Sequence, residues 1–189
     1  MSPSPLNTLA ARLESITALD GPAGAAAGVV NTALPAGPAK DLLSGTWLGH
    51  ALHPLVTDVP VGAWTSAAIL DWTGGRDSRG AADRLILTGL LAAGAAAVTG
   101  WSDWADAEAD SPAVRRSGLV HAALNGTAAT LMIGSYRARR RGDRGRGRLL
   151  SVAGTAALGA GGWLGGHLSY TLGSGVSSPA PAAGAQSAA

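Results

Sequence analysis

Residues 85–101 read LILTGLLAAGAAAVTGW and contain no charged side chain. A helix needs about 20 predominantly apolar residues to cross a bilayer, with a range of roughly 17–25. A helix on the surface of a soluble protein carries polar residues every three to four positions, and this segment has no such stripe. The segment therefore predicts a transmembrane helix. The alternative for an alanine-rich chain is a soluble helical bundle.

Three further segments have the length and apolar character of membrane spans, at residues 53–72, 118–136 and 149–170. The first is the least regular because it contains Pro54, Asp58 and Pro60. We expect a broken helix entrance there, covered by neighbouring protein. The sequence thus predicts an all-α fold, an integral membrane four-helix bundle that occupies residues 46–176.

The two ends of the chain have a different composition. Residues 1–45 are expected to form an extracytoplasmic segment. Within it, LNTLAARLESITAL at residues 6–19 has the apolar spacing of a short amphipathic helix that lies on the membrane surface. Residues 177–189 are mostly alanine, serine and proline, and such a tail is predicted to be disordered.

The arginines predict the orientation of the bundle. The loop RARRRGDRGRGR at residues 137–148 contains seven arginines, and Arg76, Arg79 and Arg84 lie on the same side. The opposite side holds the other four of the 14 basic residues, which are Arg12, Lys40, Arg115 and Arg116. Cytoplasmic loops carry the excess of arginine and lysine. We therefore expect a multi-pass protein of a bacterial cell membrane with both termini extracytoplasmic.

Composition excludes several classes of site. The chain has no cysteine, which rules out disulfides, thiolate metal ligands and an iron–sulfur cluster held by its own thiolates. The pI of about 9.7 does not indicate a nucleic-acid partner, because half of the basic residues lie in one short loop without interleaved aromatic residues.

All four histidines fall near the predicted outer face. His50 and His53 lie at the start of the first span, His121 lies three residues into the third, and His167 lies three residues before the end of the fourth. At about 1.5 Å of rise per residue, they lie within roughly 5 Å of one plane. Polar groups at this depth are costly and usually mark a functional site.

Other residues accompany the histidines along these spans. Asn125 follows His121 by one helical turn and shares its face. Asp58 is a candidate proton acceptor, or a group that orients a ligating imidazole. Gly165 and Gly166 beside the last histidine permit close helix packing and equally the approach of a flat macrocycle.

Histidines on several bundle helices are a common way to hold haem iron or a metal ion. We expect haem b near the outer face, in a protein that transfers electrons. His53 with His121 is one possible axial pair, because the first and third helices of an up–down bundle lie diagonally. His121 with His167 is the other.

Two alternatives stay open. In the first, His53, His121 and His167 bind a transition-metal ion such as copper, zinc or iron, together with Asp58. In the second, the protein is a structural or assembly subunit whose histidines only form hydrogen bonds between helices. The sequence does not decide whether the protein is an enzyme.

Four motifs carry a resemblance to a known family: GHALHPLVTDVPVGAW (49–64), GWSDW (100–104), HAALN (121–125) and WLGGHLSYTLG (163–173). They resemble the bacterial membrane family catalogued as domain of unknown function 2231. Its members are four-span proteins, some fused to or encoded beside a Rieske iron–sulfur domain. The resemblance implies redox work with a separate Rieske-type partner.

The family motifs map here onto His50, His53, Pro54, Pro60, Gly62, His121, Asn125, Gly165, Gly166 and His167. The chain departs from the family at Ala51, where a proline is frequent. This departure weakens the case for His50 as a ligand.

Overall fold

Each of the four apolar segments lies in one long helix. The computed structural model describes residues 4–175. Its helices are α1 (Pro5–Glu14), α2 (Asp20–Ala33), α3 (Pro38–Ser44), α4 (Leu52–Thr73), α5 (Arg79–Ala107), α6 (Pro112–Arg140) and α7 (Arg144–Gly166). Short 3-10 turns lie at Thr17–Leu19 and Thr46–Leu48, and a π-helical turn at His167–Thr171 extends α7. The described part contains no strand, so the predicted all-α class is confirmed.

Local sequence signals explain where the long helices begin and end. Ser111 caps α6, since its hydroxyl accepts the N–H of Val114, and a proline follows at the first helical position. The carboxylate of Asp143 accepts the N–H of Arg146 and caps α7 in the same way. Between them, Gly142 adopts φ 85°, the left-handed conformation that commonly follows a helix C-terminus.

The first span is more regular than expected. Pro54 lies in the first turn of α4, where a missing N–H has no helical partner to lose. Pro60 lies inside the helix and is buried, yet α4 continues through it from Leu52 to Thr73. The expected broken entrance was therefore wrong.

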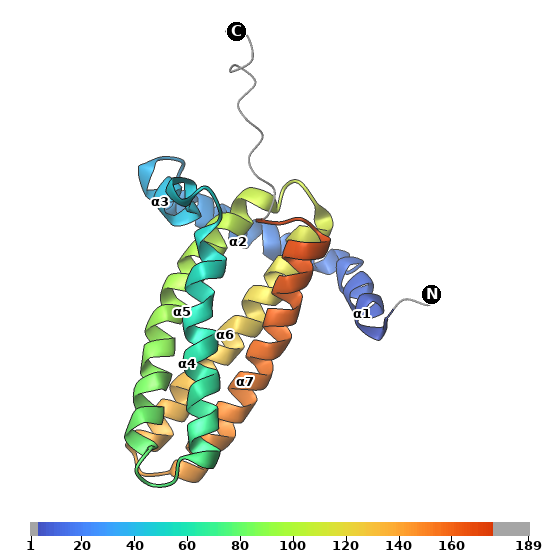
Figure 1. Cartoon of the computed structure of the whole chain (residues 1–189). Coiled ribbons are helices and arrows are strands. Elements are labelled where there is room, and N and C mark those ends of the chain that lie inside the picture. The colour runs from blue at the N-terminus through green and yellow to red at the C-terminus, as the bar shows by residue number, and fades with distance from the viewer. Residues whose placement is uncertain (1–3, 176–189) are drawn as a thin grey trace, which may run out of the picture.

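The long helices form two antiparallel hairpins, α4–α5 and α6–α7, that pack side by side (Figure 1). A buried cluster of Trp64, Ala67, Ile86, Ala128, Met132 and Leu158 joins them halfway along the bundle. The Trp64 indole donates a hydrogen bond to the Ile86 carbonyl at 3.2 Å and lies directly against Gly89. A methyl group at Gly89 would come within 2.2 Å of that indole.

The second hairpin repeats the first at equivalent positions. His53, Trp64 and Asp71 on α4 are each 68 residues before His121, Met132 and Arg139 on α6. Gly89 and Gly100 on α5 are likewise each 65 residues before Gly154 and Gly165 on α7. Equivalent side chains meet across the bundle: His53 and His121 toward one end, and Asp71 and Arg139 toward the other. The arrangement is that of an approximate twofold axis along the bundle.

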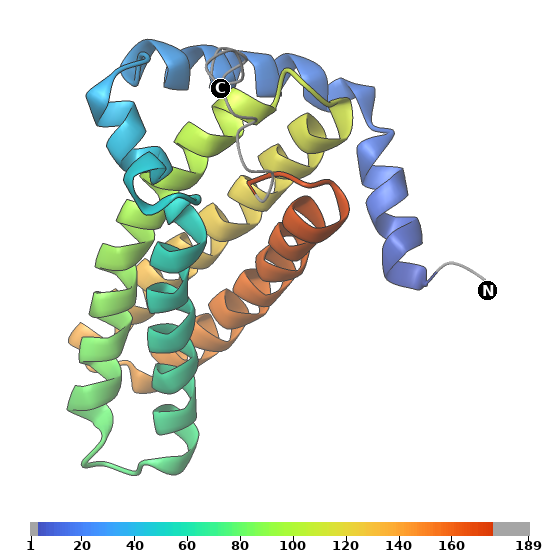
Figure 2. The same cartoon turned by 45° about the horizontal axis from the view of Figure 1, so that its top comes forward.

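The N-terminal helices cross the end of the bundle where α4 begins (Figure 2). Ala23 and Ala27 of α2 pack against Trp104, Val114 and other residues of that end. The expected surface helix over 6–19 corresponds to α1 and the following turn, whereas α2 and α3 were not anticipated. The tail expected to be disordered, 177–189, lies outside the described residues.

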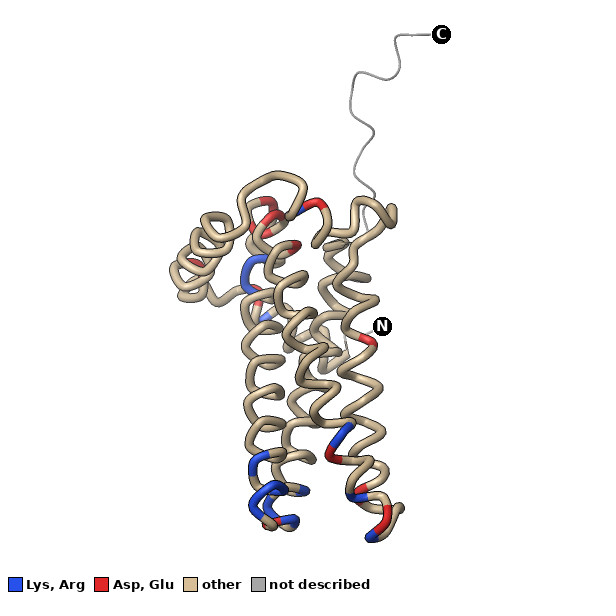
Figure 3. Tube along the Cα trace, turned by 90° about the vertical axis from the view of Figure 1, so that its left-hand side faces the viewer, with Lys and Arg blue, Asp and Glu red and all other residues tan. Residues whose placement is uncertain are grey.

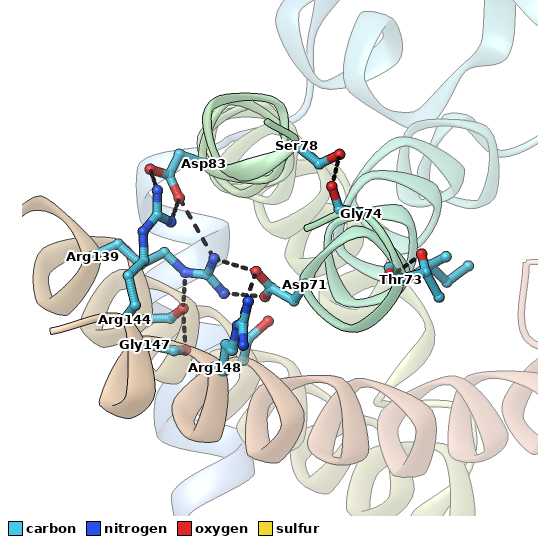
Figure 4. Close-up of polar contacts among 12 residues, drawn as sticks. Asp71, Thr73, Gly74, Ser78, Asp83, Arg139, Arg144, Gly147 and Arg148 are labelled. Carbon is cyan, nitrogen blue, oxygen red and sulfur yellow. Dashed lines mark hydrogen bonds and ion pairs between the residues drawn. The ribbon is translucent and has the colours of Figure 1, made fainter. Parts of the chain in front are cut away.

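Arginine residues gather at the opposite end (Figure 3). There, Arg139 is wholly buried and binds both carboxylate oxygens of Asp71, whose side chain is 4% exposed (Figure 4). Arg144 binds Asp83 at 2.5 and 2.9 Å, and Arg148 lies 3.9 Å from Asp71. The first hairpin supplies the carboxylates of this network and the second supplies the arginines.

Two of the long helices in the described part are long and apolar enough to cross a membrane, α5 and α7 with its extension to Thr171. In each, only 28% of the most apolar window is buried inside the protein. The core helix of a soluble protein would be mostly buried.

Candidate cofactor site

A cavity of about 490 Å³ lies inside the bundle, toward the end that the N-terminal helices cover. Its volume falls within the range of roughly 300–1,000 Å³ that is usual for ligand sites. Side chains from α4, α5, α6 and α7 line it. Many are small, among them Ala93, Ala96, Ala97, Gly100, Gly118, Ala122, Gly126, Gly162, Gly165 and Gly166. We call this space the histidine cavity, because His53 and His121 are part of its wall.

His53 enters the cavity from the first turn of α4. Its Nδ1 lies 2.9 Å from the Ala96 carbonyl of α5. Because a carbonyl oxygen only accepts, Nδ1 carries the proton and donates it. The tautomer therefore leaves the lone pair on Nε2, the nitrogen available to a metal. The ring lies against Gly100, where a methyl group would come within 2.6 Å of Cε1.

His121 repeats this arrangement in the second hairpin. Its Nδ1 lies 2.8 Å from the Gly161 carbonyl of α7, so Nδ1 is again the donor. A methyl group at Gly165 would come within 2.9 Å of the ring. The Asn125 amide nitrogen lies 3.0 Å from Nε2 and 3.0 Å from the His121 carbonyl. The amide thus donates toward the Nε2 lone pair.

The two imidazoles face each other across the cavity. Their ring centroids are 6.3 Å apart and their planes are 81° from parallel. Metal–imidazole bonds are about 2.0–2.1 Å long and a ring nitrogen lies about 1.1 Å from its ring centroid, so two imidazoles on opposite sides of one ion have centroids about 6.2–6.4 Å apart. The observed separation of the ring centroids falls within this range.

His167 does not join this pair. Its Nε2 lies 2.6 Å from the Glu14 carboxylate of α1, and its ring stacks on Trp163 at 6.1 Å. His167 is absent from the lining of the histidine cavity, although Gly166 and Leu168 beside it are part of the wall. The alternative axial pair of His121 with His167 is therefore not formed.

Two more predicted site residues lie outside the cavity. His50 is exposed, and its Nδ1 lies 3.0 Å from the Ala51 carbonyl. Asp58 is exposed on α4 and does not line the cavity. Among the described residues, no group of three or more His, Cys, Asp or Glu is placed to hold a metal ion. The expected three-histidine cluster is thus reduced to a pair.

Sequence reasoning missed the residues that position the imidazoles. Ala96 and Gly100 were not singled out, and Gly165 was assigned to His167 although it lies against His121. The repeat carries the missing signal, because a glycine on the second helix of each hairpin faces the histidine on the first. Thr57 and Asn125 are also equivalent, since each follows its histidine by four residues and binds its carbonyl.

Aromatic and polar residues surround the cavity near the N-terminal helices. Trp101 and Trp104 pack edge to face with centroids 5.2 Å apart, and both line the wall. The Trp104 indole donates to the Val114 carbonyl at 3.3 Å. Asp103 and Tyr170 also line the cavity, so this end is more polar than the interior.

Comparison with known proteins identifies the family of the chain. A family model described as a predicted membrane protein, DUF2231, matches residues 49–178. No curated protein and no solved structure matches the chain. The family match includes both histidines, both hairpins and all residues of the cavity wall. The chain belongs to the DUF2231 family of predicted membrane proteins.

Proposed function

We propose that this protein binds haem b between His53 and His121, near the outer face of the membrane, and transfers electrons. One observation carries the proposal: two imidazoles of matching tautomer face each other at 6.3 Å across a cavity of about 490 Å³. A haem bound there supplies a reversible one-electron couple, and two histidine ligands leave no open position on its iron. Electron transfer therefore fits this site better than chemistry on a bound substrate.

The chain's own groups prepare the pair for this role. Ala96 and Gly161 accept the Nδ1 protons and so hold both rings by backbone atoms. Such hydrogen bonds orient a ligating imidazole and raise its basicity. Asn125 must release Nε2 of His121 for a metal to bind, and it can keep its contact with the His121 carbonyl.

The small residues of the wall suit a flat ligand. Gly162, Gly165 and Gly166 occupy one side, while Gly100 and the alanines of α5 occupy another. Any side chain longer than hydrogen at Gly100 or Gly165 would displace an imidazole.

The four-span topology, with both termini extracytoplasmic, is part of the proposal. Large apolar side chains are exposed on all four long helices, as with Ile69 at 57%, Leu91 at 72%, Ile133 at 39% and Leu149 at 71%. Soluble proteins rarely expose such apolar surface continuously. The charge asymmetry between the two ends supports the orientation.

The electron partner is proposed to be a separate polypeptide, and the family resemblance suggests a Rieske-type protein. The bare transition-metal alternative has weaker support. A tetrahedral metal site needs four ligands, whereas no group of three or more His, Cys, Asp or Glu in the described part of the chain is placed to hold a metal ion, and Asp58 lies outside the cavity.

The test is absorption spectroscopy of the protein purified in mild detergent and supplemented with haem. A Soret band is expected in the wild type and in His50→Ala and His167→Ala, which serve as matched controls. His53→Ala and His121→Ala are expected to lose it or to bind haem at least tenfold more weakly.

Two results would contradict the proposal directly: no haem uptake by the wild type, or haem binding by the two cavity variants as strong as that of the controls. Bound metal without porphyrin absorption would support the bare-ion alternative instead. Wild-type partner binding by a variant without any cofactor would support a structural subunit.

A further inference from the structure

Six of the seven arginines of residues 137–148 divide into two groups with different surroundings, and the seventh, Arg140, is exposed and belongs to neither. Arg139, Arg144 and Arg148 form the buried network with Asp71 and Asp83 (Figure 4). Arg137, Arg141 and Arg146 are exposed and have no carboxylate within 4.0 Å in the described part of the chain. Only the first group neutralises charge inside the protein.

The exposed group surrounds a second cavity. It has a volume of about 250 Å³ and is lined by Gly134, Arg137, Ala138, Arg141, Asp143, Arg146 and Leu150. Arg137 and Arg141 are one helical turn apart on α6, so their side chains are neighbours. Arg146 reaches the same cavity from the first turn of α7. Three arginines, from the C-terminal end of α6 and the first turn of α7, therefore line one concave site.

One acidic group belongs to this site. Asp143 lines the cavity, and its carboxylate accepts the backbone N–H of Arg146 as the cap of α7. Three arginines against one carboxylate leave a net charge of +2 on the wall. Guanidinium groups match phosphate oxygens in geometry and bind them bidentately. The chemistry of the wall thus selects a phosphate-bearing anion.

The wall on the membrane side is apolar. Gly134 and Leu150 face each other across the two helices, with a methyl group at Gly134 predicted to contact Leu150 at 3.4 Å. The next residues toward the membrane centre on α6 and α7 include Ile133 and Val152, which are 39% and 45% exposed. A molecule with an anionic head and apolar chains matches both surfaces.

We propose that this cavity binds the phosphate headgroup of an anionic phospholipid of the cytoplasmic leaflet. Basic pockets between transmembrane helices on this side of a membrane bind such headgroups. The inference rests on the proposed membrane topology and is independent of haem binding. A bound lipid would bridge α6 and α7 at the loop and hold the second hairpin at a set depth.

The test measures phosphatidylglycerol binding to the full chain in detergent by native mass spectrometry, with phosphatidylcholine as the uncharged reference. The triple variant Arg137→Gln, Arg141→Gln and Arg146→Gln is compared with a control in which Arg76, Arg79 and Arg84 are changed to glutamine. The control removes the same charge from exposed arginines of the other loop at this end.

The expected result is a preference of the wild type for phosphatidylglycerol that falls about tenfold or more in the first variant and less than about twofold in the control. Equal losses in both variants would overturn the proposal, because binding would then follow net charge alone. Competition by inorganic phosphate as strong as that by the lipid would also overturn it in favour of a free anion. Elution volume and helicity confirm folding, and unchanged haem uptake separates this test from that of the histidine cavity.

Discussion

Replacing Gly100 by alanine tests how closely the helices hold the histidine pair. The new methyl group would lie 2.6 Å from Cε1 and 2.8 Å from Nδ1 of His53, which is closer than van der Waals contact. The neighbour is a ring held by a hydrogen bond to the Ala96 carbonyl, so it cannot rotate away without losing that bond. Overpacking of this kind costs about 1–3 kcal/mol.

Alanine also gains helix propensity over glycine, by about 1 kcal/mol, and this gain must be separated from the clash. Gly94→Ala is the matched control, because Gly94 lies on the same helix and a methyl group there meets nothing within 4 Å. The propensity gain is common to both variants and cancels in their difference. Gly100→Ala should therefore be about 1–3 kcal/mol less stable than Gly94→Ala.

The assay is loss of helicity during denaturation with sodium dodecyl sulfate, on protein without haem. Haem titration of the same two variants then asks whether the displaced ring still binds. We expect a loss of haem affinity of about fivefold to 150-fold for Gly100→Ala relative to Gly94→Ala, if the same 1–3 kcal/mol is expressed in binding. Equal stability and equal haem affinity of the two variants would refute the packing described here.

Three further changes have expected outcomes. Arg139→Gln removes the bidentate partner of buried Asp71 and leaves only Arg148, at 3.9 Å, as a countercharge. It should lower the free energy of unfolding by about 3–5 kcal/mol, measured in the same assay; a loss below about 1 kcal/mol would contradict the burial of the pair. Hydrogen bonding to Arg116 lowers the pKa of Asp20. Docking of the N-terminal helices should therefore be stable above the unfolded-state pKa of Asp20 and weaken as pH falls through its lower folded-state pKa. Hydrogen exchange of α2 should show this acid dependence in the wild type and not in Arg116→Gln. The chain has no native cysteine, so Thr32→Cys should react with an impermeant maleimide in intact cells and Arg140→Cys only after permeabilisation, and the reverse pattern would contradict the orientation.

The helical framework followed from sequence because its signals are local. The long apolar runs that predicted it each lie within one segment, and the structure adds local caps at Ser111 and Asp143 and a turn at Gly142. The N-terminal α2 was missed because its glycine-rich sequence has low helix propensity. Ala23 and Ala27 are buried in tertiary contacts with the bundle, which favour the helix nonetheless.

The sequence predicted that His53, His121 and His167 lie at a similar depth, but not which of them face the cavity, because depth along the membrane does not specify the face of a helix. Gly161 and Gly165 of α7 face His121. His167 is two residues further, which is about 200° around the helix, so it points toward Glu14 on the other side. Asp58 follows His53 by five residues, or about 140° net around the helix, and is exposed for the same reason.

The internal repeat would have distinguished the histidines. His53 and His121 are equivalent in the two hairpins and so meet near the axis, as Asp71 and Arg139 do at the other end. In contrast, the position equivalent to His167 on α5 is Ser102, which is not a ligand. Long-range equivalence of this kind is visible only once the two hairpins are aligned.

The coordination of the iron tests the central claim most directly. Electron paramagnetic resonance of the oxidised, haem-loaded protein should give a low-spin signal in the wild type, because the proposal assigns both axial positions to imidazole. His53→Ala and His121→Ala should each change the iron to high spin or lose it, and His167→Ala should keep the wild-type signal. A high-spin wild type, or a low-spin signal that persists without both cavity histidines, would contradict the account.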